Sequence, residues 1–177
     1  MPIDPGALAP GDVLLYGGTG LFNRIIQVKT WSRYSHVEVY DGGGWSLASR
    51  NGIGVGRYPA RIDDALAVYR LRVPFDLEAG RAYFAESEGQ GYDWWGLLAF
   101  TSAKFQGRDN GKQFCSEFAA RWCRRAIGAK AHHPSAKAGH ATALAVLGLD
   151  PWNGYDADGI SPGEFAKSAL LRLEMTS

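Results

Sequence analysis

Long uninterrupted apolar runs are missing from this chain of 177 residues, and cysteine is scarce, with only Cys115 and Cys123. No segment approaches the roughly 20 apolar residues that a membrane-spanning helix needs, so the sequence predicts no integral membrane segment. The first residues, MPIDPGALAPGD, contain neither the basic region nor the apolar region of an export signal. We therefore expect the protein to be cytoplasmic as synthesised.

An excess of charge of one sign is also lacking. The chain has 19 basic and 18 acidic residues and a net charge of +1, and its basic residues form no stripe, which argues against nucleic acid as a partner. Hydrophobic residues make up 46% of the chain, enough for a core at this length. With no internal repeat and no interdomain linker, residues 1–177 are predicted to form a single domain. Its oligomeric state is not predicted.

Short apolar segments separated by glycine and proline predict a mixture of strands and helices. The predicted strands are 11–16, 35–40, 45–49 and 65–73. The predicted helices are 21–31 with Thr19 as its cap, 77–89, a segment that begins near Tyr92 with Asp93 as its cap, 115 to about 128, and 161–173. The glycine-rich segment 50–62 is predicted to be a loop. This count of elements predicts an α+β fold.

The two cysteines fall on one predicted helix, eight residues apart, which corresponds to about 12 Å of helical rise. Because a disulfide requires Cα atoms within roughly 7 Å, both thiols are predicted to be free, as in a reducing compartment. Cys123 lies among apolar neighbours at helical spacing and is predicted to be a core residue. Cys115 lies in the first turn, where unpaired N–H groups and the helix dipole favour a thiolate.

An activated cysteine also needs a base, and the four histidines differ in their settings. His132, His133 and His140 fall in a segment of small residues and are predicted either to be solvated or to support other residues of a site. His36 falls inside the alternating strand SHVEVY, where it shares a face with Glu38 and Tyr40. A histidine on a sheet and a cysteine at a helix start are the arrangement that a thiolate–imidazolium pair requires.

Five motifs, PGDVLLY, SHVEVY, GYDW, FCSEF and SPGEFA, follow one another along the chain. In this order the chain resembles the circularly permuted papain-like amidases of the NlpC-type superfamily, the YiiX/YaeF-like group, from about residue 9 to residue 170. The resemblance implies an antiparallel sheet packed against helices, with the nucleophile at a helix N-terminus. It further implies that Cys115 is the nucleophile and His36 its general base. Members of this group, and the related lecithin:retinol acyltransferase-like proteins, cleave or transfer acyl groups at amide or ester bonds.

The chain departs from this group at one position of interest. YiiX-like relatives carry a Glu on the strand after the histidine strand, where this chain has Ala48. Glu38 is a candidate for the missing acid, because residues two apart on a strand have Cβ atoms about 7 Å apart on one face. Ser46 and Ser49 are the alternatives, which would orient the imidazole without charge. The SHVE motif and the serine-containing next strand are similar to phage and prophage members of the superfamily.

In such a pair the thiolate is expected to attack an acyl carbonyl and form an acyl-enzyme, with the oxyanion held by backbone donors at the helix start, the N–H of Cys115 included. Tyr16, Tyr92 and Ser116 are the candidate substrate-binding residues. No metal site or cofactor is predicted. A loop with Asp156, Asp158 and Gly159 resembles a calcium loop, but Phe165 replaces its bidentate acid, and neither a P-loop nor a paired Cys/His zinc motif is present.

Two classes of function follow from these observations. The first is a cysteine amidase or peptidase acting on a peptide or acyl-amide substrate, such as a peptide of bacterial peptidoglycan, with a lipid esterase, thioesterase or acyltransferase as a variant of the same chemistry. The second is a weakly active or inactive papain-like module that binds a peptide or lipid, or that forms part of a phage particle. A cell-wall substrate would require lysis, a phage tail or a secretion system for delivery.

Overall fold

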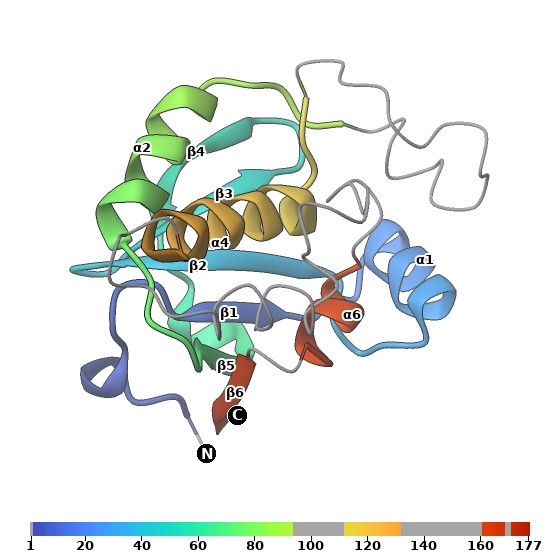
Figure 1. Cartoon of the computed structure of the whole chain (residues 1–177). Coiled ribbons are helices and arrows are strands. Elements are labelled where there is room, and N and C mark those ends of the chain that lie inside the picture. Colours follow the sequence, from blue (N-terminus) through green and yellow to red (C-terminus); the bar gives the residue numbers. More distant parts are fainter. Residues whose placement is uncertain (1, 94–111, 132–160, 169–170) are drawn as a thin grey trace.

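A computed structural model of the chain describes residues 2–93, 112–131, 161–168 and 171–177 (Figure 1). Its centre is a six-stranded sheet in the order β4-β3-β2-β1-β5-β6, in which every neighbouring pair is antiparallel. The strands are β1 (Val13–Tyr16), β2 (His36–Gly42), β3 (Trp45–Arg50), β4 (Gly54–Pro59), β5 (Ala65–Leu71) and β6 (Leu171–Thr176). Together with the helices, this sheet confirms the predicted α+β class.

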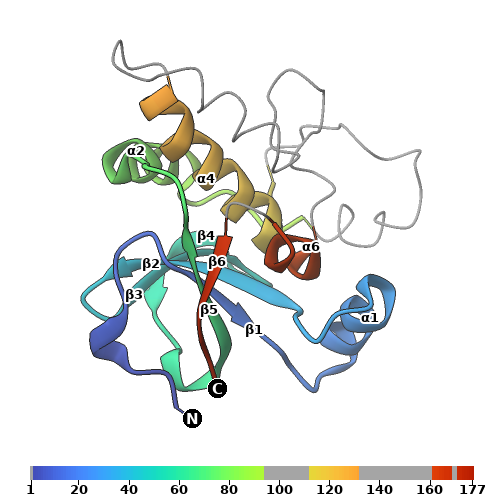
Figure 2. The same cartoon turned by 60° about the horizontal axis from the view of Figure 1, so that its bottom comes forward.

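Four α-helices are described, together with two short 3-10 helices, η1 (Pro5–Ala7) and η2 (Ile62–Asp64). The α-helices are α1 (Leu21–Thr30), α2 (Leu77–Ser87), α4 (Cys115–Ala131) and α6 (Pro162–Ala166). Figure 2 shows α2 and α4 side by side on one face of the sheet. Asp76 caps α2 by accepting bonds from two backbone N–H groups, whereas α1 begins after Gly20 without a side-chain cap, so the predicted cap at Thr19 is wrong.

The alternation predicted for residues 35–40 places β2 correctly in the sheet. Val37 and Val39 pack against α4 in the main core, in which the side chain of Trp122 is completely buried. Tyr40 lies on the opposite face, in a second apolar cluster with Leu14 and Tyr16 of β1. His36 and Glu38 share that opposite face, as predicted from the period of two.

The segment predicted as the loop 50–62 contains an additional strand, β4, which pairs with β3 along its whole length. Two of its residues are glycines because other groups approach closely. A Cβ atom at Gly54 would lie 2.2 Å from the backbone oxygen of Gln90, and one at Gly56 would lie 2.8 Å from the Tyr58 hydroxyl. The glycines that predicted a loop therefore mark close contacts within a strand.

The predicted helix 161–173 is wrong in its second half. The helix α6 begins at Pro162, one residue after the start of the predicted helix, but ends at Ala166, and the chain then forms β6 at the edge of the sheet. Pairing with β5 accounts for the difference, because Leu171 lies opposite Leu71 and is buried in the main core, whereas the two residues that follow it are exposed. Tertiary pairing thus overrides the helical spacing of these leucines.

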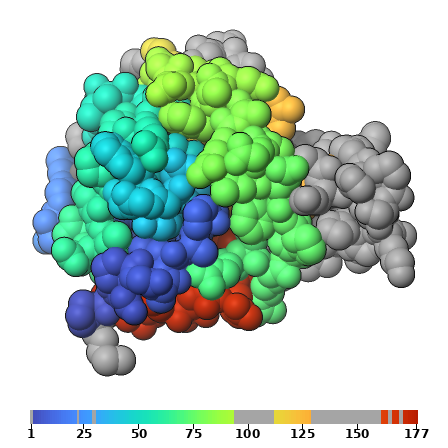
Figure 3. All heavy atoms as spheres, turned by 90° about the vertical axis from the view of Figure 1, so that its left-hand side faces the viewer, coloured from blue at the N-terminus to red at the C-terminus, as the bar shows by residue number. Residues whose placement is uncertain are grey.

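The end of β2 remote from His36 is tied to its surroundings by ion pairs. Asp41 accepts bonds of 2.9 Å from both Arg57 of β4 and Arg81 of α2. Figure 3 views the molecule from this side, where α2 (green) and the N-terminal segment (blue) come to the surface. This arrangement holds α2 against the edge of the sheet that carries β4.

Several predicted features lie outside the described residues. They are the helix expected to continue beyond Asp93, the three histidines at 132, 133 and 140, and the loop with Asp156, Asp158 and Gly159. Among the helices that the structure does describe, not one has the length and apolar character needed to cross a bilayer.

Candidate active site

Cys115 is the first residue of α4, and it lies where β2 and β3 part. Strand pairing between β2 and β3 includes Val39 with Leu47. One step further along the sheet, Val37 and Ser49 bond to the start of α4 instead. The Val37 N–H donates to the Cys115 thiol, and the Ser49 hydroxyl donates to the carbonyl oxygen of Gln113 at 2.5 Å. The opening between the two strands therefore fixes the nucleophile candidate against the sheet.

A second segment reaches the same helix start from the other side. Gly91 forms a parallel bridge with Lys112, and the Gln113 N–H donates to the Gly91 carbonyl at 3.1 Å. The buried Gln113 side chain joins this segment to α2, because it accepts a bond of 2.7 Å from Tyr83 and donates one of 2.7 Å to Gln90. As a result, the Tyr92 hydroxyl forms a hydrogen bond with the Cys115 thiol.

His36 opens β2 and contacts both other members of the predicted catalytic set. Its Nε2 lies 3.0 Å from Oε1 of Glu38, and its ring also forms a hydrogen bond with the Cys115 thiol. Because Glu38 engages Nε2, Nδ1 is the ring nitrogen left to face the thiol. The structure thus brings Cys115, His36 and Glu38, three residues from two distant parts of the sequence, into one connected arrangement.

The electrostatics of this arrangement favour an ion pair. Burial opposes charge on the Cys115 thiol, but the His36 cation and hydrogen bonds from His36 and the N–H groups of Val37 and Ser116 outweigh it and lower the thiol pKa. Burial likewise opposes charge on His36, yet the Cys115 charge and bonds to Cys115 and Glu38 raise its pKa to about 9. Each charge stabilises the other, which favours a thiolate beside an imidazolium.

Cys123 provides the contrast within the same helix. Both cysteines are free, as predicted, and both are buried. Burial raises the pKa of the Cys123 thiol to about 12. Its place in the main core confirms the prediction that Cys123 is a structural residue.

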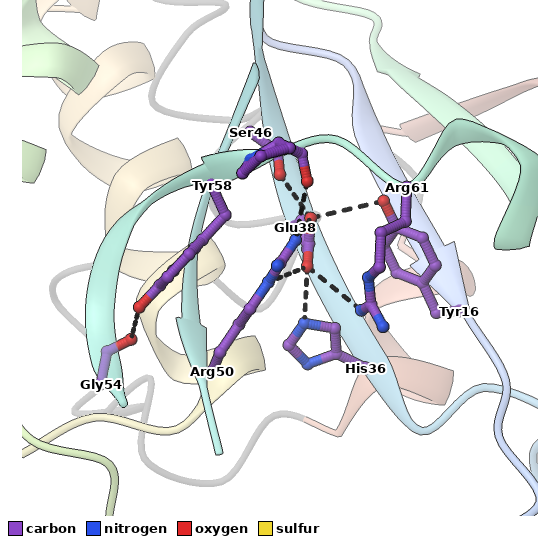
Figure 4. Close-up of polar contacts among 9 residues, drawn as sticks. Tyr16, His36, Glu38, Ser46, Arg50, Gly54, Tyr58 and Arg61 are labelled. Atoms are coloured by element: carbon purple, nitrogen blue, oxygen red, sulfur yellow. Dashed lines mark hydrogen bonds and ion pairs between the residues drawn. The ribbon is translucent and has the colours of Figure 1, made fainter. Parts of the chain in front are cut away.

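Glu38 is completely buried and is surrounded by donors (Figure 4). Besides His36, its carboxylate accepts hydrogen bonds from the hydroxyls of Ser46 and Tyr16, the latter at 3.4 Å. Arg50 donates to both carboxylate oxygens, at 2.9 and 3.1 Å, and Arg61 donates to Oε1 at 3.3 Å. Burial alone would raise the Glu38 pKa, but the bonds from His36, Arg50 and Ser46 together hold it well below its ordinary value.

The two arginines are the site residues that sequence reasoning did not identify. Arg50 ends β3 and Arg61 precedes η2, and each guanidinium lies over an aromatic ring, 4.4 Å from the Tyr58 centroid and 4.9 Å from the Tyr16 centroid, respectively. The period of two on β3 contained a signal for Arg50, because it lies on the same face as Ser46. No local pattern pointed to Arg61, which follows β4, the strand predicted as loop.

The remaining predicted residues take different positions. Ser46 bonds Glu38, and Ser49 bonds Gln113, so neither hydroxyl contacts the imidazole. Tyr16 is buried and its hydroxyl contacts Glu38, with burial and the Glu38 charge raising its pKa. Ser116 is also buried, and within the described part of the chain its hydroxyl has no hydrogen-bond partner. Of the three residues expected to bind substrate, Tyr92 contacts the thiol with its side chain and Ser116 contacts it through its backbone N–H.

The position of Ala48 explains how the sheet accommodates Glu38. Continuing the register of Val39 with Leu47 by one residue sets Ala48 opposite Glu38. Ser46 and Arg50, the residues two positions before and after Ala48 on the same face, both bond the Glu38 carboxylate. The methyl group at position 48 leaves room for the carboxylate, which therefore comes from β2 in this chain.

No family model matches the chain, and no curated protein matches it. A search of solved structures found the fold in YiiX from Escherichia coli O157:H7, a protein of the DUF1105 group described as a metalloprotein. The two structures align with a TM-score of 0.61 at 16% sequence identity, over 95% of this chain and 97% of the YiiX chain. At this level of identity the likeness shows a common fold.

The description of YiiX raises the question of whether the present residues fit a metal ion. In the part of the chain that the structure describes, no group of three or more His, Cys, Asp and Glu side chains is placed to hold one. The Glu38 carboxylate is engaged by two arginines, and in the part of the chain that the structure describes Cys115 and His36 belong to no set of three ligands. The described residues therefore do not fit a metal site here.

Proposed function

We propose that this protein is a cysteine hydrolase of the amidase or peptidase type, with the permuted papain-like fold that its motifs resemble. The observation that supports this most strongly is the position of His36, bonded to the Cys115 thiol on one side and to the Glu38 carboxylate on the other. Cys115 is the nucleophile, His36 the general base and acid, and Glu38 the group that orients the imidazole. The likeness to YiiX supports the YiiX-like part of the resemblance.

The reaction follows from the ion pair. The Cys115 thiolate attacks the acyl carbonyl carbon, and a C–S bond forms as the carbonyl π electrons move to oxygen. The His36 imidazolium then gives its proton to the departing amine, and the C–N bond breaks to leave a thioester. Water, deprotonated by the now neutral His36, attacks the thioester, and the acid product and the thiolate are released.

Backbone donors near the thiol supply the stabilisation of the oxyanion. The N–H groups of Val37 and Ser116 both face Sγ of Cys115, and the Tyr92 hydroxyl reaches the same atom. When the thiolate is consumed by bond formation, these donors lie beside the new tetrahedral centre. Donors fixed before the reaction stabilise the developing charge without reorganisation.

The proposed substrate is a peptide or acyl amide, with a peptidoglycan peptide as the leading class because of the NlpC-type resemblance. The same acyl-enzyme chemistry serves an ester or thioester, so a lipid substrate requires no change in the residues. The alternative, an inactive binding or phage structural module, rests on Ala48 at the position of the family's acid. The contact of Glu38 with His36 supports the catalytic alternative, because a carboxylate is provided from β2.

The test of this proposal is the rate of iodoacetamide alkylation at Cys115 as a function of pH, in the wild type and in His36→Ala. In the wild type we expect the alkylation rate of Cys115 to reach half of its maximum at a pH well below the ordinary thiol pKa of roughly 8.5. Removing the imidazolium raises the Cys115 pKa, so His36→Ala requires a higher pH for the same rate. Peptide mapping by mass spectrometry separates the two cysteines.

Cys123 is the internal control, because it is equally buried in α4 but has its pKa raised to about 12. It should react slowly in both proteins over the whole range. If Cys115 titrates like Cys123, or titrates at the same pH with and without His36, the nucleophile assignment is wrong and a binding function becomes the better proposal.

A further inference from the structure

Two arginines bind a single carboxylate next to the proposed ion pair. Arg50 and Arg61 approach Glu38 from either side of the carboxylate, with His36 beside them (Figure 4). With His36 protonated, three cationic groups face one buried carboxylate and one thiolate. The cluster therefore carries one positive charge more than its own anions neutralise.

The hydrogen-bonding capacity of the Glu38 carboxylate is filled without Arg61. A carboxylate offers about four lone-pair sites. His36, Ser46 and the two nitrogens of Arg50 already occupy that number, and Tyr16 adds a longer contact. The Arg61 bond is the longest of the nitrogen contacts, at 3.3 Å, and it uses only Nη2. In the described residues, Glu38 is the one acid with which Arg61 forms an ion pair.

Arg61 is also the most accessible member of the cluster. Its side chain is 45% exposed, compared with 20% for Arg50 and 17% for His36. Its Nη2 contacts Oε1 of Glu38, the same oxygen that His36 Nε2 contacts, so the guanidinium lies next to the imidazole. Its stacking on Tyr16 holds the planar fork in place, and among the described residues Nη2 is the one Arg61 nitrogen that donates a hydrogen bond.

We propose that Arg61 is a specificity residue that binds an oxyanion of the substrate, a carboxylate or a phosphate, close to the bond that Cys115 attacks. Guanidinium groups bind both anions through paired N–H donors. A substrate with such a group beside its scissile carbonyl supplies the anion that the cluster lacks. This inference rests on the proposed function, since it assumes that Cys115 is the nucleophile.

The experiment compares alkylation of Cys115 by iodoacetate and by iodoacetamide. The two reagents have nearly the same size and the same reaction, in which Sγ forms a bond to the CH₂ carbon and iodide leaves, but only iodoacetate carries a carboxylate. We measure the ratio of their second-order rates in the wild type, Arg61→Gln and Arg61→Lys. The ratio should fall several-fold in Arg61→Gln, because the variant lacks a cation that attracts the reagent carboxylate. Arg61→Lys should retain most of it.

Arg57→Gln is the matched control. Arg57 is 44% exposed, lies 4.8 Å over the Trp45 ring and pairs with one carboxylate, that of Asp41, at the remote end of β2. Its removal changes the net charge equally but should leave the rate ratio unchanged. An unchanged ratio in Arg61→Gln, or an equal fall in Arg57→Gln, would overturn the proposal. The neutral reagent reports on the nucleophile separately, so failure of iodoacetamide to label Cys115 contradicts the proposed function instead.

Competition distinguishes the two oxyanions. Acetate and inorganic phosphate are added at equal ionic strength while iodoacetate labels Cys115. Slower labelling with acetate in the wild type, absent in Arg61→Gln, assigns a carboxylate. Labelling that is slowed by phosphate but not by acetate assigns a phosphate group. If neither salt changes the labelling rate of the wild type relative to Arg61→Gln, the result contradicts an oxyanion site.

Discussion

At the scale of single residues, the site depends on how Glu38 is held. A buried carboxylate is unfavourable unless its charge is paired and its oxygens accept hydrogen bonds. Here Ser46 and Arg50 from β3 satisfy the oxygens, and the carboxylate in turn fixes the ring of His36. The imidazole is therefore held in an orientation that leaves its other nitrogen for Cys115.

Tyr92 provides a test of the oxyanion donors at this scale. Tyr92→Phe removes a hydroxyl that bonds the thiol, and we expect kcat/KM for 4-nitrophenyl acetate to fall by about 10²-fold, the usual effect of losing one oxyanion donor. Alkylation by iodoacetamide develops no oxyanion, so its rate at Cys115 should change far less. Stopped-flow or steady-state hydrolysis and alkylation rates on the same variant provide both values.

Tyr40→Phe is the control for this variant. The Tyr40 hydroxyl accepts a bond of 3.1 Å from the Gly44 N–H at the other end of β2, away from Cys115. Its loss should leave both rates unchanged. If Tyr92→Phe slows hydrolysis and alkylation by the same factor, its hydroxyl acts on the thiolate itself and has no role as an oxyanion donor.

At the scale of elements, the position of Cys115 depends on how α4 is packed. Its start is tied to β2, β3 and the segment 91–93, and its middle is tied to α2 through Trp122. A Cβ atom at Gly80 of α2 would lie 2.5 Å from the Trp122 ring. Glycine at this position allows the two helices to approach closely enough for the indole to be completely buried.

Substitutions at two helical glycines test this packing. Gly80→Ala should lower the free energy of unfolding by about 1–3 kcal/mol, because Trp122 is enclosed and has little room to move. Gly128→Ala, in α4, meets nothing within 4 Å and should raise that free energy by about 0.5–1 kcal/mol through helix propensity. Urea denaturation measures both. A stable Gly80→Ala variant would contradict the close approach of α2 to α4.

At the scale of the whole molecule, the sheet joins parts of the chain that are remote in sequence. The strand β6 from the C-terminal part of the chain pairs with β5. The central strand β2 carries the cluster around Glu38 near its start and the ion pair of Asp41 with Arg57 near its end. Charge is therefore concentrated at both ends of one central strand. The free energy of unfolding should depend on pH mainly through Glu38, which is the completely buried acid of these two clusters.

The pH dependence of folding follows from the depressed pKa of Glu38. In the folded protein this carboxyl stays ionised at pH values where it is protonated in the unfolded chain. Its contribution to stability is complete above the ordinary pKa of 4.5 and decreases as the pH falls below that value. The free energy of unfolding of the wild type should therefore fall as the pH is lowered below about 4.5, and that fall should be smaller in Glu38→Gln.

Asp63→Asn serves as the control, because Asp63 is exposed on η2. The free energy of unfolding of Asp63→Asn, measured by urea denaturation at each pH, should depend on pH as it does in the wild type. An acid dependence in Glu38→Gln as steep as in the wild type would show that the charge of Glu38 does not stabilise the fold.

Much of this arrangement was accessible from local patterns. Alternation along SHVEVY predicted which side chains of β2 share a face, and the polar residues before Cys115 predicted a helix that begins there. Both patterns depend on periodicity and helix-end chemistry, which act within a few residues. For the same reason Glu38 could be named as a partner of His36, since the two lie two residues apart on one strand.

Long-range contacts decided the rest. The strand β4 forms because β3 supplies its partner, and the leucines of the C-terminal segment join β5 although their spacing also suits a helix. The meeting of Arg61 with Glu38, and of Tyr92 with Cys115, depends on segments that only the closed sheet and α4 bring together. Local propensities contain no term for such contacts, whose free energy arises when distant surfaces are buried against each other.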